Sequence, residues 1–216
     1  MSIVSQKRGG LALVSSPKHI SSHRIRLVSY AKDLEIDYIE VDADNLPEDL
    51  LEINPSGRLP TLFDRNLVLI NDRVISEYLD ERFPHPALMP IEAELRAKIR
   101  LFGLEIEAQW YDLVNQLEHE KLSPAKKKAY QKTLREQIVQ FSPMIKNSHY
   151  IIGQELSLLD CCILPVLWRL QHLEIDLPKN AFTQSLFKYM DFHFKQEYFK
   201  KALSKYEAGL RPEYAL

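Results

Sequence analysis

Residues 54–64 constrain the fold of this chain more than any other stretch. They read Asn-Pro-Ser-Gly-Arg-Leu-Pro-Thr-Leu-Phe-Asp, so a polar glycine turn runs into Leu59-Pro60 and then into a short apolar strand. Proline donates no backbone N–H and is therefore confined to the start or the edge of a strand. Two interpretations follow. Pro60 is either a trans proline on an edge strand or a cis proline that presents the backbone of Leu59 to an extended peptide, as strand-addition sites do.

The composition is that of an ordinary globular protein. Apolar residues make up 45% and charged residues 27% of the 216 residues, a length that suits one compact unit or two small domains. The formal net charge of −2 gives no overall attraction to nucleic acid or to anionic membranes. No apolar run has the roughly 18–20 residues of a membrane span, and the first residues lack the apolar core of a signal peptide. We therefore expect a cytoplasmic protein that binds neither nucleic acid nor membrane directly.

Residues 11–87 show the pattern of an α/β domain. Short apolar or alternating runs predict four strands, and apolar residues at helical spacing predict three helices. The order of strand, helix, strand, helix, strand, strand, helix predicts a mixed four-stranded sheet with helices on both faces. Ser21 and Ser22 are the expected cap of the first helix. The expected strands are 11–15, 36–41, 60–64 and 67–70, and the expected helices begin near residues 21, 47 and 73.

The pattern changes after Pro90 and predicts an all-α bundle over residues 88–210. Between Leu95 and Leu117 apolar residues recur at steps of three and four, which predicts one long helix with a continuous apolar stripe. A later helix opens with Ser157 and Asp160 in the spacing of a capping box. The other expected elements are helices over residues 130–145, 186–194 and 199–206, one possible strand over 149–152, and loose tails at 1–10 and 211–216.

Two motifs carry a family resemblance. The spacing Asn-Pro-x-Gly-x-x-Pro-x-Leu resembles the thioredoxin-like half of glutathione-transferase-like proteins. The stretch Phe-Pro-His-Pro at residues 83–86, followed by Leu-Met-Pro at 88–90, is more specific and resembles the bacterial stringent starvation protein A family. Residues 156–161 and 165–170 extend that resemblance, which covers about residues 10–205. It implies the glutathione-transferase fold, α/β plus all-α, with a thioredoxin-like domain at 11–87 and a helical domain at 88–210.

The resemblance also implies a function. Members of this family are homodimers that lack transferase activity, bind RNA polymerase holoenzyme with its sigma factor, and alter transcription under starvation, acid or stationary-phase stress. The family's Pro-His-Pro segment lines the surface pocket needed for that contact, which nominates Pro84, His85 and Pro86. The alternative is that these residues only link two domains. One departure is Glu92, where the family commonly has an aromatic residue, and the sequence leaves open whether the partner subunit is identical or a paralogue.

The glutathione site of the fold is altered at two positions. Alignment on the family places His19 where a transferase has the serine or cysteine that activates the thiol. Asn71-Asp72 replaces the usual Glu-Ser or Gln-Ser of the γ-glutamyl pocket, and the Asp72 charge opposes a carboxylate ligand. We interpret Asp72 as a helix N-cap, and His19, Leu59, Pro60, Asn71 and Asp72 as vestigial glutathione positions in a protein that is not an enzyme. The alternative is a glutathione-dependent transferase or peroxidase in which His19 or Ser16 activates the thiol.

The remaining candidates favour structural roles. Cys161 and Cys162 are adjacent, a spacing that suits neither a disulfide framework nor a zinc cluster, so we expect two buried thiols, no metal and no cofactor. Trp110 and Trp168 fall on apolar helical stripes and are expected in the core. The lysines at 126–128 read as a solvated helix face. Arg24 and Arg26 are expected on the surface of the first helix.

Overall fold

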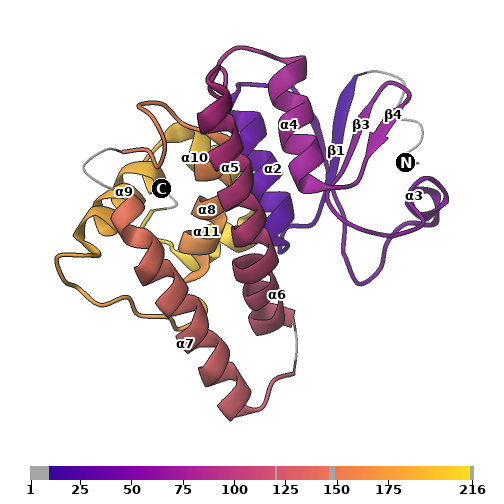
Figure 1. Ribbon diagram of the computed structural model, residues 1–216. Helices are drawn as coiled ribbons and strands as arrows, with labels where there is room; N and C mark the ends of the chain where they lie inside the picture. Colours follow the sequence, from indigo (N-terminus) through magenta and orange to yellow (C-terminus); the bar gives the residue numbers. More distant parts are fainter. Residues whose placement is uncertain (1–9, 120, 146–148, 215–216) are drawn as a thin grey trace.

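The N-terminal half contains the expected mixed four-stranded sheet. The computed structural model describes residues 10–119, 121–145 and 149–214. The strand order is β2-β1-β3-β4, with β1 parallel to β2 and antiparallel to β3, and β3 antiparallel to β4. The sheet lies on one side of the molecule and the helical half on the other (Figure 1). The elements are β1 Leu11–Ser15, α2 Ile20–Ala31, β2 Asp37–Glu40, α3 Glu48–Ile53, β3 Thr61–Asp64, β4 Leu67–Leu69 and α4 Asp72–Arg82.

Alternation along the strands builds a core on each face of the sheet. Leu13 and Leu62 point into the large core shared with α2, α4 and the helical half. Their neighbours Val14 and Phe63 point the other way, where Leu50 of α3 covers them. The two helical layers predicted from the sequence are therefore confirmed, with α3 on one face and α2 and α4 on the other (Figure 1).

Asn54 builds the turn that precedes β3. Its buried amide donates to the carbonyl of Arg58 at 2.8 Å and to the hydroxyl of Thr61 at 3.0 Å. Gly57 has a φ of +61°, a conformation that side chains other than glycine rarely adopt. The Leu59-Pro60 bond is cis, so the interpretation of Pro60 as a trans edge-strand proline is wrong and the cis geometry is confirmed. The His85-Pro86 bond is also cis, although no feature of the sequence indicated it.

The helical half begins with one long run. The helix predicted between Leu95 and Leu117 is present, and it contains a π-helical segment at Glu107–Tyr111 that joins α5 to α6. Figure 1 shows α5 and α6 as one column beside the long helix α7. Residues 149–152 form bends and no strand. The elements are α5 Ala93–Ile106, α6 Asp112–His119, α7 Pro124–Phe141, a 3₁₀ turn Ser142–Met144, α8 Leu158–Arg169, α9 Gln184–Phe194, α10 Glu197–Ala202 and α11 Lys205–Leu210.

Capping residues decide two helix boundaries. The capping box of Ser157 and Asp160 opens α8 as predicted, and Asp160 also accepts hydrogen bonds from Ile151 N–H and the Tyr189 hydroxyl. The single helix predicted over residues 199–206 is wrong. Ser204 forms a second capping box with Glu207, so the chain turns there and starts α11.

The first helix also starts earlier than predicted. His19 is the N-cap residue of α2, without a side-chain capping bond, and Ser21 and Ser22 already lie inside the helix. The hydroxyl of Ser22 instead accepts a hydrogen bond from the backbone of Ser16. Ser22 therefore fixes the loop after β1.

The tryptophans and cysteines occupy the expected core positions. Trp110 and Trp168 are buried, and the indole N–H of Trp168 donates to the carbonyl of Glu207. Cys161 and Cys162 are buried free thiols, and burial raises the pKa of both, that of Cys162 to about 11. Within the described residues, no helix is long and apolar enough to cross a membrane.

Candidate functional site

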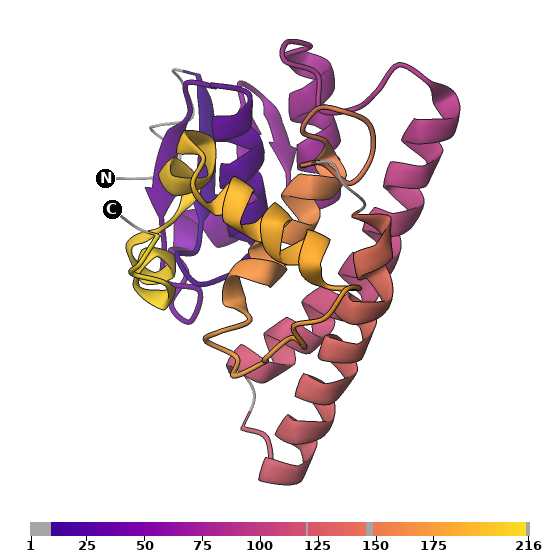
Figure 2. The ribbon, with the colours of Figure 1, turned by 90° about the vertical axis from the view of Figure 1, so that its left-hand side faces the viewer.

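The Pro-His-Pro segment lies exposed on the linker between the two halves. Pro84, His85 and Pro86 are all exposed. The linker runs from the end of α4 to the start of α5, across the top of the molecule in Figures 1 and 2. The three residues nominated from the sequence are therefore accessible to a large partner.

A buried ion pair holds this linker in place. The carboxylate of Asp80 accepts from the backbone N–H of Leu88 at 2.7 Å and of Met89 at 3.0 Å. It also pairs with the ammonium of Lys32 at 2.8 Å, and that ammonium donates to the carbonyl of Pro86. Lys32 is only 2% exposed and Asp80 only 7%. The buried ion pair of Lys32 and Asp80 thus fixes the backbone of the linker that carries the exposed Pro-His-Pro segment.

Sequence reasoning missed both members of this pair. Asp80 directly follows Leu79, which belongs to the apolar stripe of the helix. The available signal was an acid next to a core position and four residues before Pro84, where the proline-rich segment begins. Lys32, at the end of α2, carries no local signal, because its partner is 48 residues away in the sequence.

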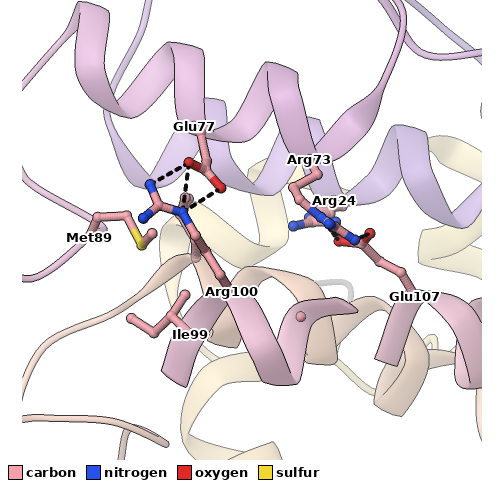
Figure 3. Close-up of a pocket in the computed structure, with 9 residues that line it drawn as sticks. Arg24, Arg73, Glu77, Met89, Ile99, Arg100 and Glu107 are labelled. Atoms are coloured by element: carbon pink, nitrogen blue, oxygen red, sulfur yellow. Dashed lines mark hydrogen bonds and ion pairs between the residues drawn. The ribbon is translucent and has the colours of Figure 1, made fainter. Parts of the chain in front are cut away.

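A second charged cluster joins α2, α4 and the π-helical segment. Glu107 accepts from Arg24 at 2.6 Å and also pairs with Arg73, and the two arginines converge on it in Figure 3. Nearby, Glu77 of α4 binds the guanidinium of Arg100 of α5 with both carboxylate oxygens. Burial opposes the charged form of Glu107, but the two arginines outweigh it and lower the pKa of this carboxyl. The cluster ties the thioredoxin-like half to the bundle.

Asp72 belongs to this cluster, and its interpretation as an N-cap is wrong. Asn71 is the N-cap of α4, and its side chain accepts from the N–H of Val74. Asp72 is the first residue of the helix, and it pairs with the guanidinium of Arg24 at 3.2 Å. The expectation of a surface position for Arg24 is also wrong, since this side chain is buried between two carboxylates.

The vestigial glutathione positions do not all line one cavity. His19 borders a groove of about 290 Å³ whose other walls include Ser16 and Lys18. Leu59, Pro60, Asn71 and Asp72 are not among the residues that line it. Three carboxylates also line this groove, those of Glu40, Asp42 and Asp44. Carboxylates at that density disfavour a carboxylate-bearing tripeptide.

A third network lies in the fully buried centre of the molecule. Glu207 of α11 pairs with Arg26 of α2 and, at 2.8 Å, with Arg169 of α8. His23 lies beside them, with its Nδ1 3.0 Å from Arg169. Arg26, like Arg24, is buried and not on the surface as expected. Burial opposes the charged form of Glu207, yet its contacts to His23, Arg26 and Arg169 outweigh burial and lower the pKa of this carboxyl to about 2.

The buried His23 should make the fold sensitive to acid. Burial, reinforced by Arg169 and Arg26 and opposed by Glu207, lowers the pKa of His23 to about 3 from 6.5. Below pH 6.5 the unfolded chain therefore takes up a proton that the folded chain refuses, and the free energy of unfolding falls as the pH falls. We expect this residue to remove about 2 kcal/mol of stability between about pH 6.5 and about pH 5.

Urea unfolding of a His23→Asn variant checks this expectation. Asparagine keeps an acceptor for Arg169 but does not titrate, so the stability of the variant should fall less steeply with acid than that of the wild type. The pH 7 values of both proteins provide the baseline. Equal slopes in the two proteins would contradict the assignment.

Comparison with known proteins identifies the family. Models of the glutathione S-transferase N-terminal and C-terminal domains match residues 9–81 and 103–197. A stringent starvation protein A homolog of Coxiella burnetii is 39% identical over 205 residues, covering 95% of this chain and 97% of that protein. The homolog of Pasteurella multocida is 40% identical over 203 residues and 94% of each chain.

Solved structures confirm the fold. The crystal structure of rice GST1 in complex with glutathione superposes with a TM-score of 0.81 and 21% identity, covering 95% of this chain and 97% of that one. The expected combination of a thioredoxin-like half and a helical half is therefore confirmed. With its sequence similarity extending over nearly the whole length of the named homologs, the chain belongs to the stringent starvation protein A family, on the glutathione-transferase fold.

Proposed function

We propose that this protein is a starvation-response regulator that binds RNA polymerase holoenzyme, including its sigma factor, through Pro84, His85 and Pro86. Membership of the stringent starvation protein A family supports a role in starvation. The observation that carries the contact is the exposed Pro-His-Pro segment held on the buried pair of Asp80 and Lys32. Proline has a fixed φ and no backbone N–H, so a segment with two prolines loses little conformational entropy when a partner binds it.

A pull-down with native holoenzyme tests the proposal. The wild type should retain the holoenzyme, and a variant with Pro84, His85 and Pro86 all replaced by alanine should retain at least about tenfold less, because a few central residues dominate most interfaces. Pro55→Ala, an exposed proline in the turn before β3, is the control and should bind like the wild type. The proposal fails if the triple variant retains as much holoenzyme as the wild type.

We further propose that the protein has no glutathione transferase activity. Three carboxylates share the groove beside His19, and Asp72 at the start of α4 is engaged by Arg24. The rival function, a glutathione-dependent transferase or peroxidase, predicts retention on immobilised glutathione and turnover of an aryl halide. Either result would overturn this part of the proposal.

We also propose a two-fold dimer that covers an exposed apolar face. The pair of Arg100 and Glu77 places α4 beside α5. On these helices Val74 is 50%, Leu101 53% and Leu104 46% exposed. A second copy packed on this face would remove these side chains from water, as isologous interfaces do.

Sedimentation velocity tests the dimer. A Val74→Glu and Leu101→Glu double variant should sediment as a monomer, because it places charges in a desolvated interface. Leu51→Glu on α3, where the side chain is 38% exposed, is the matched control and should sediment like the wild type. A monomeric wild type, or a dimeric double variant, would contradict the assignment, and a wild type that dimerises only with a related chain would point to a heterodimer.

A further inference from the structure

A groove continues from the Pro-His-Pro segment along the linker. It has a volume of about 420 Å³, and its walls are residues 87–92 together with Leu95 on one side and residues 152–157 on the other. Residues 87–92, which line the groove, belong to the linker that runs across the top of Figures 1 and 2. The groove therefore extends the surface that the proposed polymerase contact uses.

The groove offers an apolar anchor on a fixed backbone. Ile91 is 94% exposed, more than any other exposed large hydrophobic side chain in the described part of the chain. The backbone around it is held on two sides. Leu88 N–H binds Asp80, and Leu88 carbonyl accepts from Leu158 N–H at 2.9 Å at the start of α8. Ile91 is thus presented to solvent by a rigid segment, an arrangement that suits binding to an apolar surface.

The charges in the groove all have one sign. Glu92 and Glu155 are its only charged lining residues. Both are exposed, and neither carboxylate has an ion-pair or hydrogen-bond partner within residues 10–119, 121–145 and 149–214. Two unpaired carboxylates repel phosphate groups and acidic segments and attract lysine and arginine.

We infer that the groove binds a basic segment of RNA polymerase holoenzyme in which an aliphatic or aromatic side chain stands beside a lysine or arginine. The apolar side chain packs on Ile91, and the cation pairs with Glu92 and Glu155. This inference rests on the proposed polymerase contact and makes it more specific. Carboxylates at the rim of an interface act mainly on the association rate and on partner choice.

Equilibrium binding of purified holoenzyme to immobilised variants, at low and at high salt, tests the inference. The Glu92→Gln and Glu155→Gln double variant should bind about fivefold more weakly at low salt, and the difference should shrink at high salt as screening increases. Ile91→Ser should bind about tenfold more weakly at both salt concentrations, because the lost contact is apolar. Glu136→Gln on α7 is the matched control and should bind like the wild type.

The outcomes separate this inference from the function on which it rests. If the Pro-His-Pro triple alanine variant loses binding while the Ile91 and glutamine variants bind like the wild type, the groove inference is overturned and the polymerase contact stands. If the wild type itself fails to bind holoenzyme, both are overturned. A glutamine double variant that binds more tightly would show that the partner segment is acidic and would also overturn the inference.

Discussion

Replacing Glu207 by glutamine should lower the free energy of unfolding by about 3–5 kcal/mol, because it leaves two buried guanidinium groups without their shared carboxylate. Arg26 and Arg169 both pair with Glu207 in the fully buried centre. Burial of an unpaired charge costs far more than an exposed pair contributes. Glu118, the other acid beside Arg169, lies 3.2 Å from that guanidinium, whereas Glu207 is bound by both arginines.

Urea unfolding at pH 7 measures the loss. Glu213→Gln is the matched control, since this side chain is exposed and its replacement should change the free energy by less than about 0.5 kcal/mol. Adding Arg26→Met to the Glu207→Gln background should recover part of the loss, because it removes one of the uncompensated charges. A loss below about 1 kcal/mol for Glu207→Gln would show that water reaches this network.

Replacing Asp80 by alanine should have a comparable effect on stability and a second effect on function. The change leaves the ammonium of Lys32 buried without its partner and removes the acceptor of two linker N–H groups. We expect a loss of about 3–5 kcal/mol in the free energy of unfolding. We also expect weaker retention of holoenzyme, because the Pro-His-Pro segment loses the contacts that fix it.

Urea unfolding and the holoenzyme pull-down are both needed for this variant. Glu81→Gln, the next residue along α4, is the control, because its exposed carboxylate lies 3.9 Å from Arg96 and should contribute little. If a folded Asp80→Ala protein retained as much holoenzyme as the wild type, the polymerase contact would not depend on the bonds from Asp80 to the linker.

Local signals in the sequence were sufficient for most of the fold. The Asn-Pro-Ser-Gly turn pointed to β3 and allowed a cis proline as one of two interpretations, and the spacing of Ser157 and Asp160 placed the start of α8. Each of these features depends on residues a few positions apart. The end of the chain was harder, because the boundary between α10 and α11 depends on a capping box inside an apparently continuous apolar pattern.

The buried charges could not be predicted, because their partners are distant in the sequence. Arg26 and Glu207 are 181 residues apart, and Arg24 and Glu107 are 83 residues apart. When no acid lies one turn away, an arginine on a helix is expected at the surface. Its buried partners become apparent only in the folded structure. The Pro-His-Pro segment was found from the motif, whereas the acidic groove beside it needed residues 152–157 to be brought against the linker.

The large hydrophobic core crosses the boundary between the two halves. It contains Leu13 of the sheet, Ile25 of α2, Trp168 of α8 and Phe199 of α10 in one continuous cluster. Removal of either half would expose a large apolar surface of the remaining half to water. Heating should therefore melt the sheet and the bundle together in one cooperative step, and either half expressed alone should precipitate.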